Sequence, residues 1–232
     1  RGLRTLSEKK FHRPVIIVNF KAYQEVNGPG ALELARICEK VSEESGLKVG
    51  ICPPMVDLGY VARNVNIPVF AQNIDPRAPG SATGWVTPAM VKGCGAAGTL
   101  INHTEHKIRL NEISECTDLA KASDLITLIC SDNDRVAAQV AQFRPDLVAV
   151  EPPDLIGGDL SVTKANPAII ENTVDAVRSV NHTVMILCGA GVKTGADVRA
   201  ALDLGADGVL LASGVVRSKD PEATVRDLIG KV

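Results

Sequence analysis

The sequence lacks a surplus of charge of either sign. Lysine and arginine together number 25, aspartate and glutamate number 27, and the formal net charge is -2 at pH 7. Proteins that bind nucleic acid usually carry an overall positive charge or a strong basic field. We therefore expect no nucleic-acid partner for this chain.

Long apolar stretches are absent as well. No run approaches the roughly 20 apolar residues of a membrane-spanning helix, and no signal-peptide pattern opens the sequence. Hydrophobic residues make up 45% of the chain and charged residues 22%, which is typical of soluble globular proteins. We expect one large domain or two small ones, with no membrane association.

The cysteines form no recognisable metal or redox motif. There is no Cys-x-x-Cys pair and no cysteine–histidine spacing typical of a metal site. In a chain of this size they indicate reduced, mostly buried thiols of a cytoplasmic protein, and we expect no metal. The six are Cys38, Cys52, Cys94, Cys116, Cys130 and Cys188.

What the sequence does contain is a repeated alternation of strand-like and helix-like segments. Short apolar or β-branched runs begin at residues 15, 47, 68, 98, 124, 146, 183 and 207. Most of them lack polar alternation, which predicts strands covered on both faces. Between the runs, apolar residues recur at three- and four-residue spacing, which is typical of helices.

This alternation predicts the fold. Strands and helices that alternate through short loops require right-handed parallel crossovers, and eight such units close into a (β/α)8 barrel of about 250 residues. An open doubly wound sheet is the alternative, but no G-x-G-x-x-G follows the first strand, where NFKAYQEV stands instead. We predict an α/β protein with a single (β/α)8 barrel, the TIM-barrel fold, over residues 14–232. The polar leader, residues 1–13, is expected to be a frayed tail or a plug at the barrel bottom.

Polar side chains stand where several predicted strands end. Asn19 and Lys21 follow the first strand, His103 the fourth and Glu151 the sixth. Taken singly, each is explained as a solvated charge, a structural histidine or a turn cap. In a barrel, however, the carboxyl ends of the strands converge on one cavity. A carboxylate, a neutral imidazole and an ammonium together suit proton abstraction beside a carbonyl.

Small residues end the last two predicted strands, at 189–191 and at 212–214. They are plain turn residues on one interpretation. On the other, their backbone N–H groups stand where barrels of this kind usually hold phosphate. The combination with the polar strand ends favours the second interpretation.

At these positions the sequence resembles the triosephosphate isomerase family, in the form typical of its shorter archaeal branch. The resemblance covers residues 14 to 232 and is carried by NFKAY, NHTEHK, VEPPDLIGG, CGAGV, GVLLASGVV and, at 83–92, TGWVTPAMVK. It implies an isomerase of glycolysis and gluconeogenesis that interconverts dihydroxyacetone phosphate and D-glyceraldehyde 3-phosphate through an enediolate. It implies a triose phosphate as the small-molecule partner and no metal or organic cofactor.

The resemblance also implies a role for each site residue. Glu151 is the catalytic base, while His103 and Lys21 polarise the carbonyl and hold the enediolate. Asn19 orients the substrate oxygen, and Glu105 has a supporting role beneath Lys21. The phosphate contacts that the resemblance implies are the backbone groups of Gly157, Gly191, Ala212 and Ser213.

The segment after Glu151 is expected to be a lid. Pro152 and Pro153 form a stiff hinge that aims the carboxylate, because proline fixes φ. The stretch PDLIGG then closes over the site and brings the Gly157 N–H group to the phosphate. Closure keeps water from the enediolate, which otherwise eliminates phosphate.

Several residues depart from the family pattern. Gly158-Asp159 stands at the lid tip in place of the common Thr-Gly. His106 and Lys107 replace a usual pair of arginines, and Thr104 replaces a usual serine. An arginine-to-lysine exchange is not neutral at a bidentate site, so these changes bear on turnover and affinity.

The resemblance also suggests roles for two further residues. Cys130 matches a family cysteine beside the catalytic glutamate and is expected to have a packing or supporting role. Trp85, with the rest of residues 83–87, is expected to lie in a subunit contact, because an exposed tryptophan on a long loop is a good anchor. The family is generally oligomeric, so we expect a homo-oligomer, either a dimer or a tetramer.

Two alternatives stay open from the sequence. One is another phosphate-binding barrel enzyme of amino-acid biosynthesis, which would lack the combination of Asn19, Lys21, His103 and Glu151. The other is a barrel that binds phosphate but has lost turnover through Asp159 or the changed arginine pair.

Overall fold

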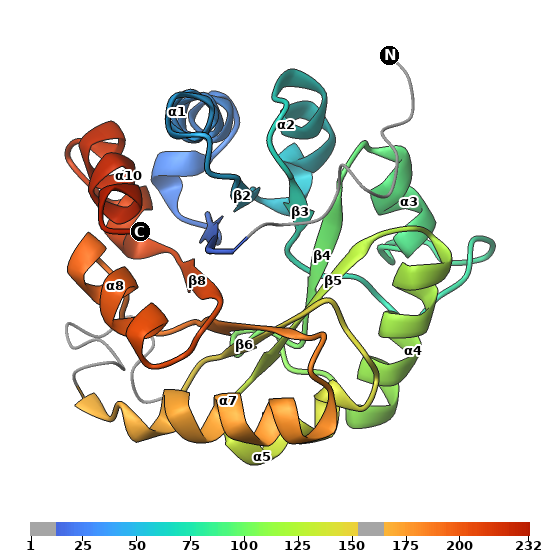
Figure 1. Cartoon of the computed structure of the whole chain (residues 1–232). Helices are drawn as coiled ribbons and strands as arrows, with labels where there is room; N and C mark the ends of the chain where they lie inside the picture. Colours follow the sequence, from blue (N-terminus) through green and yellow to red (C-terminus); the bar gives the residue numbers. More distant parts are fainter. Residues whose placement is uncertain (1–12, 153–164) are drawn as a thin grey trace.

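The structure, a computed structural model, describes residues 13–152 and 165–232. Within these ranges eight parallel strands alternate with helices that surround them (Figure 1). The barrel predicted from the sequence is therefore confirmed. Residues 1–12 of the expected leader and the expected lid, with Gly157 and Asp159, lie outside the described residues.

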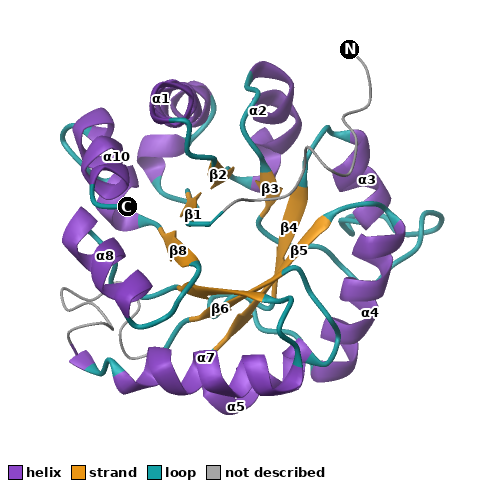
Figure 2. Cartoon of the chain, viewed as in Figure 1, coloured by secondary structure: helices purple, strands orange, loops and turns teal. Residues whose placement is uncertain are grey.

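The strands form a single ring, shown in orange in Figure 2. Their hydrogen-bonded order is β2-β1-β8-β7-β6-β5-β4-β3, and an isolated parallel bridge between Ile51 and Val69 joins the two end strands. Every predicted run contains one of the strands. They are β1 Val15–Asn19, β2 Val49–Cys52, β3 Phe70–Ala71, β4 Gly98–Ile101, β5 Ile126–Ser131, β6 Leu147–Val150, β7 Met185–Cys188 and β8 Gly208–Leu211.

The longer helices match the apolar spacing in the sequence, and each begins or ends at a recognisable signal. For example, α1 has proline at its first position and ends at Gly46, whose φ of 72° is the left-handed conformation that favours glycine. These helices are α1 Pro29–Ser45, α4 Leu110–Ala122, α5 Asp134–Ala141, α7 Ala168–Val180, α8 Gly195–Asp203 and α10 Pro221–Gly230.

The apolar spacing in the sequence did not predict the short helices, because a segment of one or two turns shows too little periodicity. They lie mainly in the connections between strands. Their bounds are η2 Gln24–Val26, η3 Met55–Asp57, α2 Leu58–Asn64, α3 Pro88–Gly93 and α9 Ser213–Val216.

The core has two layers, which explains why the strands lack polar alternation. Ile16 and Val18 of β1 belong to the layer between the sheet and the helices, whereas Val15 and Ile17 point into the barrel interior. Phe70 fills part of that interior, and a Cβ on Gly98 would lie 2.5 Å from its ring. The interior is thus packed with side chains and leaves no room for chemistry below the strand ends.

A buried carboxylate holds the amino-terminal end of the strand ring together. Asp207, 3% exposed, accepts the Ile186 N–H at 2.9 Å and pairs with Arg13 at 2.8 Å. Since Asp207 directly precedes β8, Arg13 is fastened to the amino end of the strand ring. The last residue of the expected leader therefore belongs physically to the barrel.

All six cysteines are free thiols, and all but Cys94 are buried. Burial raises the pKa of Cys38, Cys116 and Cys188 to about 12. These thiols stay protonated at neutral pH and act as small apolar fillers. In the described ranges, none of the helices is both long and apolar enough to cross a membrane.

Candidate active site

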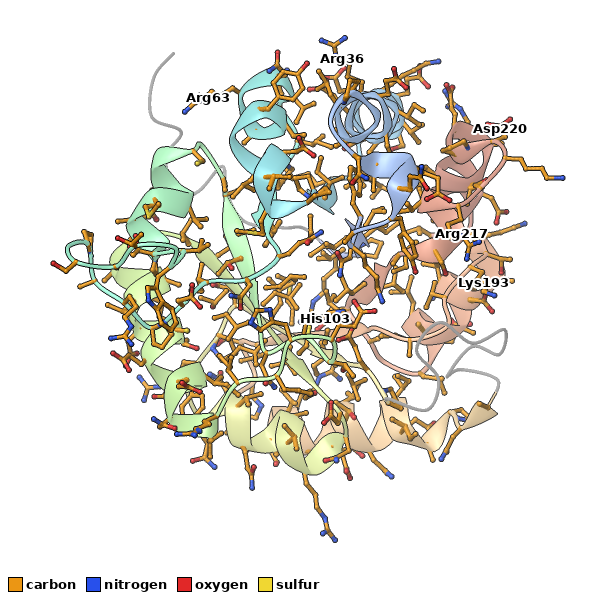
Figure 3. The ribbon with its side chains drawn as sticks, turned by 180° about the vertical axis from the view of Figure 1, so that it is seen from behind. Arg36, Arg63, His103, Lys193, Arg217 and Asp220 are labelled. Carbon is orange, nitrogen blue, oxygen red and sulfur yellow. The ribbon has the colours of Figure 1, made fainter. Side chains whose placement is uncertain are left out.

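The side chains singled out in the sequence meet at the carboxyl ends of the strands. One pocket there is lined by Asn19, Lys21, His103 and Glu151, together with residues 189–193 and 210–213 and Tyr23. Figure 3 shows His103 at the middle of the strand ring, while Arg36, Arg63 and Asp220 lie on the periphery. The structure therefore brings these separate parts of the chain to one cavity.

Lys21 is held in an unusual backbone conformation. Its φ is 53°, in the left-handed region that costs energy for residues other than glycine. The Lys21 N–H donates to Asn19 Oδ1 at 2.9 Å, and the Gln72 side chain donates to the Lys21 carbonyl at 2.8 Å. The two amide side chains stabilise the turn that aims the lysine into the pocket.

The Lys21 ammonium has a defined partner. Its Nζ lies 2.8 Å from Glu105 Oε1, where the lysine side chain is 13% exposed and the glutamate 54%. The contact matches the place beneath the lysine that the sequence suggested for Glu105. Because the glutamate faces water, its charge is screened and only part of the lysine charge is neutralised.

His103 has its tautomer fixed by the backbone. The Glu105 N–H donates to Nδ1 at 3.1 Å, so in the neutral imidazole the proton is on Nε2. Nε2 lies 3.4 Å from Glu151 Oε1. A neutral imidazole in this orientation offers an N–H donor to the pocket beside the carboxylate.

The turn that carries His103 is also held in the left-handed region. Asn102, with φ of 61°, donates from its side chain to the Cys130 carbonyl at 3.0 Å. Its Oδ1 accepts the Ile108 N–H at 3.1 Å. These bonds connect the loop after β4 to β5 and fix where the imidazole lies.

Glu151 is a buried carboxylate that is not locked into an ion pair. It is 3% exposed, and no lysine or arginine of the described ranges lies within ion-pairing distance. Its Oε2 finds no hydrogen-bond donor among the same residues. Desolvating a carboxylate without full compensation costs several kcal/mol, and such groups are concentrated at functional sites.

Glycine at position 189 leaves the space that Glu151 occupies. A Cβ there would stand 2.4 Å from Glu151 Cγ and 3.0 Å from the Val150 carbonyl oxygen. Both contacts are too short for real atoms, so any larger residue would displace the carboxylate. The small residue at the end of β7 thus makes room for the Glu151 carboxylate and also lets the backbone turn.

Two thiols lie in the protein interior beneath the carboxylate. Cys52 and Cys130 are fully buried, and burial followed by the negative charge of Glu151 raises the pKa of both thiols. They remain protonated and form part of a poorly hydrated floor to the site. Cys130 is therefore near the base, as the resemblance suggested, and its role stays a prediction.

Two residues that line the pocket together with Glu151 have backbone N–H groups with no backbone acceptor in the described ranges. The N–H groups of Gly191 and Ser213 donate to no backbone carbonyl within the described residues. Gly191 has φ of 68°, which turns the loop after β7 toward the loop after β8. With Ala212 they line one pocket, and neighbouring backbone N–H groups of this kind can hold anions.

Three residues that depart from the family pattern, Thr104, His106 and Lys107, fall within the described residues and lie beside the site. Lys107 pairs with Asp132, and Thr104 Oγ1 lies 3.4 Å from the same carboxylate. His106 does not line the main pocket but an adjoining one. The lysine that replaces a usual arginine thus has a single carboxylate partner.

The adjoining cavity has a volume of about 710 Å³. Trp85 lies in its wall, 43% exposed, with the Arg77 guanidinium 4.6 Å from the ring centroid. Lys21, His103 and Glu105 line this cavity. Lys21 and His103 also line the first pocket, and Glu105 pairs with Lys21. The expected subunit contact at Trp85 therefore lies next to the candidate active site.

Sequence reasoning missed two residues near the substrate pocket: Lys193 lines it, and Gln72 lines the adjoining cavity. Gln72 also donates to the Cys52 carbonyl at 3.0 Å and so ties the ends of β1 and β2 together. Its place just after the third apolar run was a usable signal, since polar strand ends were the criterion for the other residues. Lys193 follows the glycine-rich end of β7, which drew attention only to backbone groups.

Comparison with known proteins identifies close relatives. The family model described as triosephosphate isomerase matches residues 14–230. The triosephosphate isomerase of Methanocaldococcus jannaschii is 50% identical over 93% of this chain and 98% of its own. Those of Methanothermus fervidus and Methanoculleus marisnigri are each 48% identical, over 94% and 93% of this chain and over 98% and 97% of theirs.

Proposed function

Because the chain belongs to the triosephosphate isomerase family, we propose that Glu151, His103 and Lys21 carry out that family's reaction here. The family and the isomerase function drawn from the sequence are confirmed by the comparisons. The reaction interconverts dihydroxyacetone phosphate and D-glyceraldehyde 3-phosphate. The observation that carries the assignment of the individual residues is the buried Oε2 of Glu151, which has no hydrogen-bond partner among the described residues.

Glu151 takes a proton from the carbon beside the carbonyl of dihydroxyacetone phosphate. The C–H electron pair forms the enediolate double bond, and the carbonyl electrons move to oxygen. The hydroxyl proton of the first carbon moves to the former carbonyl oxygen, and Glu151 returns the carbon-bound proton to the neighbouring carbon, which together give the aldehyde and its new hydroxyl group. Its burial beside protonated thiols supports this role, because little water competes for the carboxylate.

His103 and Lys21 stabilise the oxygen that becomes negative. The Nε2–H of His103 points to the side of the pocket where Glu151 acts, and Lys21 supplies a positive charge. Donors that are already in place need no reorganisation when charge develops. Asn19 supports this pair by holding the Lys21 backbone and orienting the substrate oxygen.

The phosphate group binds at the backbone N–H donors of Gly191, Ala212 and Ser213. Their position opposite Glu151 in the pocket separates the anionic end of the substrate from the reacting carbons. The N–H of Gly157, which lies outside the described residues, is the remaining phosphate contact that the family resemblance implies. No metal or organic cofactor is required, because proton transfer needs only these acid, base and donor groups.

The arrangement disfavours the alternatives that the sequence left open. Another phosphate-binding barrel has no use for an imidazole 3.4 Å from a buried glutamate. A barrel that binds only phosphate does not need an unpaired carboxylate beside the phosphate site. Both alternatives predict that the imidazole and the glutamate contribute nothing to the binding of the part of the ligand beyond the phosphate.

Titration with 2-phosphoglycolate, a mimic of the enediolate, tests the proposal. We expect the analogue to bind about 100-fold or more tightly than inorganic phosphate, because transition-state analogues gain from donors aimed at the developing charge. Isothermal titration calorimetry of both ligands gives the two dissociation constants. Equal affinities would show a phosphate-only site and would favour the degenerate barrel.

We also propose that the active protein is a cytoplasmic homo-oligomer, a dimer or a tetramer. Large apolar side chains are exposed on η3, α2 and α3, with Val56 92%, Tyr60 52% and Met90 58% exposed. Clustered exposed apolar groups mark interaction surfaces. Sedimentation velocity at micromolar concentration should show a species of at least twice the monomer mass, and a purely monomeric protein would contradict this proposal.

We propose that residues 14–232 are one catalytic barrel and residues 1–13 a leader. The contact between Arg13 and Asp207 supports a junction at this point, since it attaches the start of the barrel to the amino end of β8.

A further inference from the structure

The turn that carries His103 is shaped by short local bonds. The Glu105 N–H donates to His103 Nδ1 at 3.1 Å, and the His106 N–H donates to the His103 carbonyl at 2.8 Å. Both bonds lie within residues 103–107, so they shape the turn but do not attach it to the rest of the barrel. Where the imidazole lies therefore depends on contacts between this turn and its neighbours.

One set of these contacts holds the base of the loop. The Asn102 side chain donates to the Cys130 carbonyl and accepts the Ile108 N–H. These bonds bring the two ends of the loop, residues 102 and 108, together beside β5. They do not reach the residues in between, which include the N–H donor to the imidazole.

Asp132 contacts this middle part of the loop from the next strand end. It directly follows β5, which pairs with β4 in the ring (Figure 1). The Lys107 ammonium forms an ion pair with Asp132 Oδ1, and the Thr104 hydroxyl donates to the same oxygen over a long hydrogen bond of 3.4 Å. Thr104 and Lys107 stand on either side of the two residues whose N–H groups bond to His103. A single carboxylate thus holds both sides of the turn.

The exposure of this ion pair indicates a role in geometry rather than in stability. The Lys107 and Asp132 side chains are 37% and 32% exposed, and ion pairs that face water add little to the free energy of unfolding. A shift of about 1 Å in a catalytic group, by contrast, lowers turnover about 100-fold. A contact that contributes little stability is therefore still important for the rate if it keeps the imidazole in place.

The ion pair also lies close to the base. Burial, followed by the negative charge of Glu151, raises the pKa of Cys130, while the positive charge of Lys107 opposes this rise. The lysine is thus near enough to act on the floor of the site. Asp132 therefore has two effects that an experiment has to separate, since it holds the turn and also neutralises a charge near Glu151.

We propose that Asp132 is a positioning residue for the reaction. By holding both sides of the turn it keeps the Glu105 N–H on His103 Nδ1, so that the ring proton stays on Nε2. Asp132 is not among the described residues that line the pocket, and it acts through His103. The inference rests on the proposed function, because it takes His103 Nε2–H as the donor to the developing oxyanion.

Kinetics and ring NMR of Asp132→Ala test the proposal. We expect kcat for glyceraldehyde 3-phosphate to fall about tenfold, because a looser imidazole is misplaced for part of the time, while KM changes by less than about twofold. In the ligand-free protein the ring ¹⁵N signals of His103 should move from one tautomer toward a mixture of two, since Nδ1 loses its fixed donor. The His103 signals are identified by their loss in His103→Gln.

Three further variants separate the two effects of Asp132. Asp132→Asn keeps an oxygen that accepts from both donors, and it should recover most of kcat. A double variant with Asp132→Ala and Lys107→Met should be as slow as Asp132→Ala, because the turn is already released. Asp118→Ala removes an exposed carboxylate of α4 that is not among the described pocket-lining residues, and it should behave as wild type.

The proposal is overturned if Asp132→Ala keeps the wild-type kcat or the wild-type ring signals of His103. Recovery of kcat in the double variant would also reject it, because the slow turnover of Asp132→Ala would then come from the freed lysine charge. If circular dichroism shows that Asp132→Ala does not fold, Lys107→Met alone decides. It should lower kcat a few-fold and shift the ring signals in the same direction, and unchanged values would reject the role.

Failure of the proposed function looks different, because the wild-type protein would then not isomerise the substrate at all. The ring signals of the ligand-free proteins do not depend on turnover. If they are the same in wild type and Asp132→Ala, Asp132 does not fix the tautomer, whatever reaction the site performs.

Discussion

Replacing Glu151 with aspartate should lower kcat by about 100-fold or more, because a shift of roughly 1 Å in a catalytic group costs that much. Glutamine at this position should lower kcat by about 10²–10⁴-fold, the usual contribution of a general base. The carboxylate is buried and cannot be replaced by solvent hydroxide or a neighbouring acid. Steady-state isomerisation of glyceraldehyde 3-phosphate in a coupled assay measures both effects.

The matched control for this prediction is Glu25→Asp. Glu25 lies on η2 at the same end of the barrel, is exposed and does not line the pocket. It should behave as wild type. Binding of 2-phosphoglycolate to Glu151→Asp should remain, since its phosphate and oxygen contacts come from other residues. Wild-type turnover by Glu151→Asp and Glu151→Gln would show that another group is the base.

Replacing His103 with glutamine should lower kcat by about 10²–10³-fold, the range seen when one donor to a developing oxyanion is removed. Glutamine can still accept the Glu105 N–H that His103 accepts at 3.1 Å, so the loop after β4 should be retained. Its amide cannot place an N–H where the imidazole Nε2 lies. The KM should change little, because the donor acts mainly on the transition state.

His182→Gln is the control for the histidine. His182 is exposed and precedes β7, at the amino end of the strands and therefore away from the pocket. Its substitution should leave kcat and KM unchanged. Circular dichroism and thermal unfolding of both variants separate lost chemistry from lost structure. If His103→Gln turns over within a few-fold of wild type, the assigned electrophile is wrong.

The fold was predictable because parallel strands covered on both faces leave a plain signal. Runs such as residues 15–18 are apolar throughout, and their two faces pack into the two layers of the core. The short α2, α3 and α9 gave no comparable signal. Their positions depend on contacts with the strand ends, which a local pattern does not contain.

The candidate site was predictable in part for the same reason. Glu151, His103 and Lys21 stand at strand ends, and the barrel brings such ends together. What the sequence did not contain is the geometry that makes them act. The left-handed turn at Lys21 and its support by Gln72 are products of tertiary packing.

Other features of the site depended on residues far apart in sequence. The tautomer of His103 follows from a local bond within its turn, but the space for Glu151 follows from Gly189, just after the next strand. Lys193 escaped notice because its position over the pocket is set by the packing of its loop on Gly214. Such close approaches cannot be read from residue types alone.

The central claim is that Glu151 moves the proton while His103 and Lys21 hold the oxygen. Incubating dihydroxyacetone phosphate in deuterium oxide with wild type or Glu151→Gln, and following the carbon-bound hydrogens by NMR, tests it most directly. Wild type should incorporate deuterium beside the carbonyl as glyceraldehyde 3-phosphate forms, while the variant should do both about 10²–10⁴-fold more slowly. Deuterium incorporation by Glu151→Gln at the wild-type rate would contradict the account.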